Sequence, residues 1–164
     1  MARTLDPASV FSLQTVILVG EEVSPLDVEK WKHMNLYCLY GQSENSKGTM
    51  IAKKSGDHSV ASIGKPFHAN AWIVHRDNVN VLVSIGAESE LVIESPCLAR
   101  GYINADEQTR ESFVANPAWM NGSGRQGEVR IFKTGDIARC NAADGLISAS
   151  GAQRDQDKDS GSAH

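Results

Sequence analysis

The first third of the chain alternates between strand-like and helix-like patterns of apolar and polar residues. Residues 15–19 form a short, β-branched apolar run, which predicts a buried strand. Ser24 and Pro25 then suit the N-cap and first position of a helix, which we expect to end near His33. A second apolar run follows at residues 35–39. This order predicts a strand–helix–strand unit, in which ligand-binding loops usually follow the carboxyl ends of the parallel strands.

After a polar turn cluster at residues 53–57, the pattern changes to short β-like runs separated by turn residues. This spacing is typical of a small antiparallel sheet or barrel. Residues 106–113 are rich in charge and acidic at their start, which predicts a helix. The expected strands are residues 71–74, 79–83, 90–93, 130–133, 137–139 and 146–147.

These patterns divide the chain into two folded parts and a tail. Residues 1–56 are expected to form the end of an α/β subdomain, and residues 57–151 a β-rich, barrel-like subdomain. From residue 153 onward, no apolar side chain is larger than alanine. We therefore expect residues 152–164 to be a disordered tail.

Composition narrows the class of protein. The 164 residues are 41% hydrophobic and carry a formal net charge of −4, and no apolar run reaches the ~20 residues that a membrane-spanning helix needs. Nothing in this balance indicates a nucleic-acid or membrane partner. Three separated cysteines, and five histidines without metal-ligand spacing, favour a cytoplasmic protein with reduced thiols and no zinc site.

Two polar runs, far apart in the sequence, contain residue types that suit a phosphate-bearing ligand. Residues 39–44 read L-Y-G-Q-S-E, and residues 132–136 read F-K-T-G-D. Each run combines a carboxylate with a glycine and a hydroxyl residue, which lets the backbone approach a polar ligand closely. Three further runs accompany them: V-G-E-E-V-S-P at 19–25, S-E-L followed by A-R-G-Y within 89–113, and N-P-A-W at 116–119.

Taken in this order, the motifs resemble those of the adenylate-forming (ANL) superfamily, in particular the adenylation domains of fungal nonribosomal peptide synthetases. The resemblance runs from about residue 13 to residue 151. It implies the end of a parallel α/β subdomain followed by a small, distorted, β-rich barrel subdomain. In that family, ATP and a carboxylic acid, usually an amino acid, react to give an acyl-adenylate and pyrophosphate. A carrier-protein domain then receives the acyl group.

The resemblance assigns roles to five residues. Tyr40 would stack on adenine beside Gly41, because a flat aromatic face suits a base. Asp136 would accept hydrogen bonds from the ribose hydroxyls of ATP or AMP, and the two side chains should converge on one cleft. Ser43 would face the phosphates, and Glu44 would hold Mg²⁺ against them as a hard oxygen ligand. The same resemblance implies an acyl pocket lined by Ile17, Val19, Leu39, Lys47 and Gly48.

Several positions depart from the family pattern. Cys38 stands where the family usually has asparagine, and Gln42 replaces a proline, which should loosen the loop. Residues 152–155 read A-Q-R-D where a glycine-arginine-x-aspartate hinge is expected. The 164 residues also contain neither the Ser/Thr/Gly-rich phosphate loop nor the catalytic lysine of the C-terminal domain. We therefore expect the chain alone not to be competent, and whether it is an enzyme stays open.

Two alternatives stay open at this point. One is a non-catalytic remnant that binds adenine nucleotide weakly or packs against a partner. The other is an acid activator of the acyl-CoA ligase type, which would share Tyr40, Glu44 and Asp136. Which acid is activated cannot be read from a partial pocket. Lys47 could equally be an ordinary exposed lysine or a residue that lines this pocket. Residues 16–19 are also expected to leave an unpaired edge and an uncovered apolar face.

Overall fold

The structure is a computed structural model that describes residues 4–20, 23–54, 61–121, 124 and 127–152. The predicted disordered tail begins at Ala152, which instead ends the last strand, and residues 153–164 lie outside the described residues. The elements are β1 (Thr15–Val19), α1 (Pro25–Trp31), β2 (Asn35–Tyr40), β3 (Met50–Lys54), β4 (Ser62–Pro66), β5 (Asn70–His75), β6 (Asn78–Leu82), β7 (Glu88–Glu94), α2 (Asp106–Ser112), β8 (Phe113–Ala115), β9 (Arg130–Cys140) and β10 (Ile147–Ala152), with 3₁₀ helices at Pro7–Val10 and Ala118–Met120.

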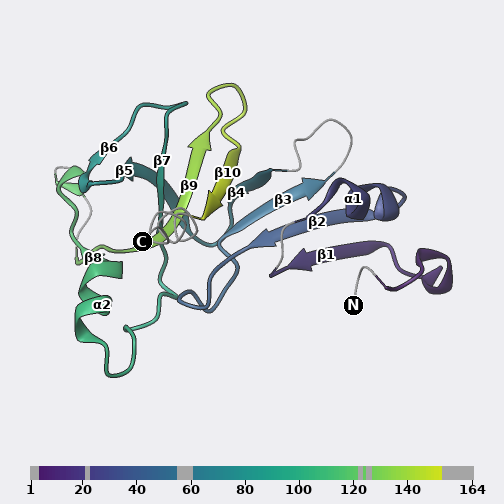
Figure 1. The fold of residues 1–164 in the computed structure, drawn as a ribbon, viewed down its shortest axis with the longest axis horizontal. Helices are drawn as coiled ribbons and strands as arrows, with labels where there is room; N and C mark the ends of the chain where they lie inside the picture. Colours follow the sequence, from purple (N-terminus) through teal and green to yellow (C-terminus); the bar gives the residue numbers. More distant parts are fainter. Residues whose placement is uncertain (1–3, 21–22, 55–60, 122–123, 125–126, 153–164) are drawn as a thin grey trace, which may run out of the picture.

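One continuous sheet joins these strands (Figure 1). Its order is β1-β2-β3-β4-β10-β9-β7-β5-β6, and β8 pairs with β9 off this path. Strand β4 connects the two halves, because it pairs with β3 on one side and with β10 on the other. Gly64 makes this junction possible: its φ is +91°, and a Cβ there would lie 1.9 Å from the Ile51 carbonyl oxygen.

The predicted strand–helix–strand unit is confirmed, but β1 is not the buried strand that was predicted, since Val16 is its one buried residue. Strands β1 and β2 are parallel, and α1 begins with a capping box in which Ser24 and Asp27 satisfy each other's backbone N–H groups. The helix ends at Trp31, two residues before the predicted end. Its Trp31 side chain packs on Val16 and Leu36, and this small apolar cluster holds the helix against one face of the sheet.

The antiparallel half contains the larger core. Strand β7 lies between β5 and β9, and residues 89–93 are all buried. Leu91 and Ile93 pack with Met50 of β3 and Ile147 of β10. Because this cluster includes residues from both halves of the sheet, the halves share one core. Within the described residues, no helix is both long and apolar enough to cross a membrane.

Some predicted boundaries are wrong. The two strands predicted at 130–133 and 137–139 form a single strand, β9, because a bulge rather than a turn separates them. The polar cluster predicted as a turn includes Lys53 and Lys54, which instead end β3. Lys54 is buried there, and its Nζ donates to the Ser62 carbonyl oxygen. The predicted helix at 106–113 ends at Ser112.

Candidate functional site

The side chains of Tyr40 and Asp136 meet where β2 ends and β9 bulges. The Tyr40 hydroxyl donates a hydrogen bond to Asp136 Oδ2, across 96 positions of sequence. Both residues are partly buried, and burial, followed by the hydrogen bond to Asp136, raises the pKa of Tyr40. The phenol therefore stays protonated and acts as a donor at neutral pH. The predicted convergence of these two side chains is confirmed, whereas their roles stay predictions.

A bulge in β9 brings Asp136 into this position. The β7–β9 pairing shifts register between Glu90 and Val92, which leaves residues 134–136 of β9 outside the regular ladder. Gly135 has φ +75°, a backbone conformation that suits glycine. The Gly135 backbone also lies close enough to the Glu90 carboxylate to favour its charged form. The bulge thus turns the backbone so that Asp136 leaves the strand next to Tyr40.

Thr134 fastens the same bulge from the other side. Its hydroxyl donates to the Leu91 carbonyl oxygen at 2.8 Å and accepts from the Asp136 N–H at 3.0 Å. Glu90 is buried, and Lys133 Nζ lies 3.6 Å from its Oε2. Burial raises the pKa of Glu90, and the charge of Lys133 acts in the opposite direction. Thr134 therefore holds the bulge before Asp136, and a buried acidic group lies beside it.

The loop after β2 presents Ser43 and Glu44 in a turn. The Asn45 N–H donates to the Gln42 carbonyl oxygen at 3.1 Å and closes this turn. Ser43 is exposed, and Glu44 is half-buried. The Tyr102 hydroxyl donates to Glu44 Oε1 at 2.6 Å, and this bond orients the carboxylate.

Two glycines let the chain segments pack closely around this loop. A Cβ added to Gly41 would lie 3.1 Å from the Gly48 Cα, so the two segments pass with little space between them. A Cβ on Gly48 would lie 2.4 Å from Leu39 Cγ. Both predicted glycine positions therefore have a steric reason in the structure, independent of any ligand.

The predicted acyl-pocket residues lie largely on one face of the β1–β2 pair. Ile17 aligns with Tyr37, and Val19 aligns with Leu39, so these side chains project from the same face of the sheet. Gly48 packs against Leu39 on that face. Ile17 is 56% exposed and Val19 63% exposed, which confirms the predicted uncovered apolar face. Lys47 is exposed too.

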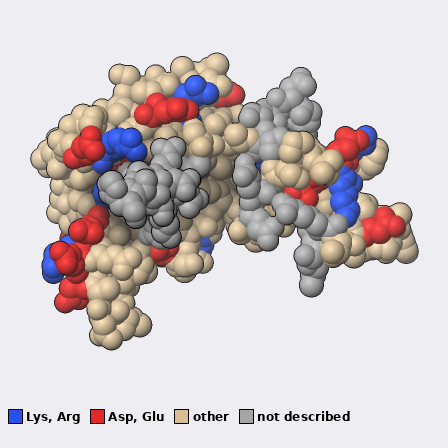
Figure 2. Space-filling view, viewed as in Figure 1, with Lys and Arg blue, Asp and Glu red and all other residues tan. Residues whose placement is uncertain are grey.

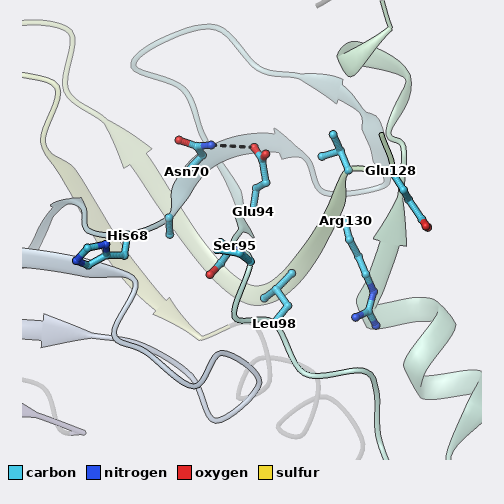
Figure 3. A pocket seen from close by; sticks show the side chains of 10 residues that line it. His68, Asn70, Glu94, Ser95, Leu98, Glu128 and Arg130 are labelled. Atoms are coloured by element: carbon cyan, nitrogen blue, oxygen red, sulfur yellow. Dashed lines mark hydrogen bonds between the residues drawn. The ribbon is translucent and has the colours of Figure 1, made fainter. Parts of the chain in front are cut away.

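A separate polar groove of about 780 Å³ lies between β5, the end of β7 and the start of β9 (Figure 3). Glu94 accepts a hydrogen bond from Asn70 Nδ2 at 3.1 Å in this groove. Arg130 points its guanidinium away, toward the Ala99 and Arg100 carbonyl oxygens, to which it donates. None of the sequence-predicted site residues lines this groove. The groove and the Tyr40 site are therefore distinct places on the molecule.

The surface and the donor groups fit only some ligands. On the face shown in Figure 2, acidic and basic side chains are interspersed, without a large area of one sign. Among the described residues, no three His, Cys, Asp or Glu side chains gather as a metal site. A single carboxylate such as Glu44 still fits Mg²⁺, which proteins often bind through one or two carboxylates together with substrate phosphates.

The motifs gave no role in the site to Glu90, Tyr102 or Thr134, and they indicated Gln42 only as a loosening substitution, yet all four residues shape the site. Each lies inside one of those motifs, since Thr134 belongs to K-T-G-D and Tyr102 to A-R-G-Y. Their place in those motifs was the available signal. What the sequence could not supply was the contact each one makes.

Comparisons with known proteins agree with this geometry. A model of the family described as AMP-binding enzyme matches residues 2–103. The chain is 45% identical over 151 residues to nonribosomal peptide synthetase 6 of Aspergillus fumigatus, and 39% identical over 141 residues to nonribosomal peptide synthetase flvI of Aspergillus flavus. These alignments cover 90% and 85% of this chain, but only 12% and 13% of the relatives. The chain thus spans about an eighth of the length of each of these two curated relatives.

A solved structure shares the fold. It is that of holo-PA1221, described as a nonribosomal peptide synthetase protein containing adenylation and PCP domains bound to a vinylsulfonamide inhibitor. The two chains superpose with a TM-score of 0.74 at 25% sequence identity. The match covers 90% of this chain and 26% of that chain.

Proposed function

The chain belongs to the AMP-binding enzyme family, and we propose that it forms the nucleoside-binding part of an adenylation domain that activates an amino acid or other carboxylic acid with ATP. Its relatives are named as peptide synthetases, which supports this proposal over an acyl-CoA ligase-type activator.

The contact between Tyr40 and Asp136 carries the proposal. Two motif residues from opposite ends of the sequence lie side by side, with a hydrogen bond from the phenol to the carboxylate. The Tyr40 ring offers a flat face to adenine. Asp136 keeps one carboxylate oxygen and further lone pairs for the ribose hydroxyls, because an ionised carboxylate accepts about four hydrogen bonds. Adenine and ribose are adjacent in AMP, so adjacent groups can bind them together.

The turn at residues 43–44 would face the phosphates. The exposed Ser43 hydroxyl can donate to a phosphate oxygen, and the Glu44 carboxylate would hold Mg²⁺. Bound there, Mg²⁺ would neutralise phosphate charge. Tyr102 fixes one Glu44 oxygen and leaves the other for a ligand.

The exposed face of β1 and β2 would form one wall of the acyl pocket. Ile17, Val19 and Leu39 present apolar side chains there. An apolar wall favours apolar parts of an acid, and it does not identify the acid. In the parent synthetase, a carrier-protein domain would receive the activated acyl group.

The binding of AMP by the isolated 164-residue chain tests the proposal. We expect calorimetry to detect weak binding, and we expect Asp136→Ala to weaken it by roughly 1.5–3 kcal/mol, the usual range for a hydrogen bond to a charged group. Asp77→Ala, which removes an exposed carboxylate from the turn between β5 and β6, is the matched control. An affinity that Asp136→Ala leaves unchanged would mean that this residue does not bind the ribose.

A second measurement separates catalysis from binding. The 164 residues contain no Ser/Thr/Gly-rich phosphate loop and no counterpart of the family's catalytic lysine. Most of the electrostatic stabilisation of the leaving pyrophosphate would then be missing. We expect no amino-acid-dependent exchange of pyrophosphate into ATP. Exchange clearly above a control without amino acid would contradict this expectation.

A further inference from the structure

Gln42 occupies an unexpected place in the candidate site. Its position holds proline in the family motif, and the substitution predicts a looser loop. In the structure the side chain is anchored instead: Gln42 Nε2 donates a hydrogen bond to the Tyr40 hydroxyl. Gln42 is thus the second residue, besides Asp136, that holds the Tyr40 phenol.

Hydrogen-bond chemistry fixes the direction of this chain of contacts. An ionised carboxylate can only accept hydrogen bonds, so the Tyr40 hydroxyl must donate its single hydrogen to Asp136. The same hydroxyl can then only accept from Gln42, which must turn its amide NH₂ toward the ring. The order Gln42 to Tyr40 to Asp136 is therefore the one arrangement in which both contacts of the Tyr40 hydroxyl are hydrogen bonds.

The other end of the Gln42 amide shows that this orientation is kept at a cost. Gln42 Oε1 is buried and has no hydrogen-bond partner among the described residues. A buried carbonyl without a partner lowers stability. A residue that served only to fill space would reach a better state by turning its amide to solvent.

The backbone of Gln42 connects the same residue to the phosphate-facing turn. Its carbonyl oxygen accepts from the Asn45 N–H at 3.1 Å and closes the turn that presents Ser43 and Glu44. The Gln42 side chain points back to Tyr40, and its main chain points forward to this turn. One residue therefore joins the two halves of the expected nucleotide site.

We propose that Gln42 is a positioning residue for nucleotide binding, which holds the Tyr40 ring against Asp136 through its side-chain amide. This inference rests on the proposed function. Proline would stiffen the loop by fixing φ, whereas Gln42 stiffens it with a side-chain tether. A ring fixed before binding loses less conformational freedom when a base stacks on it, so the tether raises affinity without touching the nucleotide.

A double-mutant cycle on the full 164-residue chain tests the inference with AMP as the ligand. Gln42→Met keeps the length and bulk of the side chain but removes the amide. We expect it to weaken AMP binding about fivefold to tenfold, the effect of one lost hydrogen bond. Tyr40→Phe removes the phenol that Gln42 holds, so Gln42→Met should have no further effect in that background. Gln108→Met, at an exposed position of α2, is the control.

Nuclear magnetic resonance supplies a readout that a general loss of structure would not give. When the chain is labelled with ¹⁵N-glutamine, each glutamine gives a side-chain amide signal. The signal that is absent from the spectrum of Gln42→Met belongs to Gln42. Tyr40→Phe should shift this signal in the ligand-free chain, and AMP should shift it in the unchanged chain. The signal of Gln108 should move in neither case.

The outcomes separate the inference from the proposed function. If the chain without substitutions does not bind AMP, the proposed function is overturned, and this inference with it. If the unchanged chain binds AMP and Gln42→Met binds it equally well, the inference alone is overturned. The inference is also overturned if Gln42→Met lowers the affinity for AMP equally with and without the Tyr40 hydroxyl. It is overturned as well if Tyr40→Phe does not shift the Gln42 signal, because Gln42 would then act by another route.

Discussion

Strands β1 and β7 have similarly apolar centres, but the molecule buries them to different extents. Of the β1 side chains only Val16 is buried, while Ile17 and Val19 are more than half exposed. In β7, residues 89–93 are all buried. The difference follows from position: β1 is the end strand with a single neighbour, whereas β7 lies between β5 and β9. Apolar composition therefore predicts a strand, and sheet order decides its burial.

This contrast extends to the candidate site. The proposed nucleoside side of the site rests on the buried strand, since the Leu91 carbonyl oxygen accepts from Thr134 in the bulge that carries Asp136. The proposed acyl side rests on the end strand, where the described residues provide one open wall. We therefore expect the nucleoside side to be well formed in the isolated chain and the acyl side to be incomplete.

Truncating the buried strand should have the largest effect. Leu91 is fully buried and packs with Ile147 and Met50. Leu91→Ala should lower the free energy of unfolding by about 2–5 kcal/mol, because it removes transfer energy and leaves a cavity. Leu26→Ala, at an 80% exposed position of α1, is the matched control and should change it by less than about 0.5 kcal/mol. Denaturant unfolding of both variants measures the difference, and similar losses would contradict the comparison.

The sequence was sufficient where local signals were strong. Ser24 and Pro25 marked the start of α1, and the apolar runs located β1 and β2. It failed where tertiary contacts outweigh local polarity. Lys53 and Lys54 read as a turn, yet β3 includes them because they pair with β2 and Lys54 donates to a buried carbonyl. Strands β3, β4 and β8 were not predicted, because β3 ends in two lysines, β4 contains a glycine and ends in a proline, and β8 has only three residues.

The site shows the same division. Motif order identified Tyr40 and Asp136, and their contact confirms that they share one place. The supporting contacts were beyond the sequence, since Glu90 reaches Gly135 only through a shift in strand register. Gln42 was read as a loosening substitution because propensity describes its backbone and not the partner its side chain finds.

Glu90 predicts how the stability of the buried half depends on pH. Its pKa is raised in the folded state by burial, so the folded chain holds this proton more tightly than the unfolded chain. The contribution of this raised pKa to stability is fully present below pH 4.5, the ordinary pKa of a glutamate. It is lost as the pH rises through the pKa of Glu90 in the folded chain. The free energy of unfolding of Glu90→Gln, minus that of the unsubstituted chain, should therefore be larger at neutral pH than at pH 4.

Denaturant unfolding of Glu90→Gln at several pH values measures this difference. Glu88→Gln, which removes an exposed carboxylate from the same strand, is the control. The bulge should be retained, because the hydrogen bonds of Thr134 to Leu91 and Asp136 do not involve the Glu90 side chain. A stability difference that does not change between pH 4 and neutral pH would show that Glu90 is not the group responsible.

The smallest effect on stability is expected at the end strand. Ile17 and Val19 are 56% and 63% exposed, and threonine keeps the β-branched shape that favours a strand. Ile17→Thr combined with Val19→Thr should change the free energy of unfolding by less than about 1 kcal/mol, about 0.5 kcal/mol for each exposed site. It should also reduce self-association, because the exposed apolar face adjoins an unpaired strand edge. Sedimentation velocity at several concentrations measures association, and Val81→Thr on the opposite end strand, β6, is the control. A large loss of stability in the double variant would show that β1 contributes to the core as β7 does.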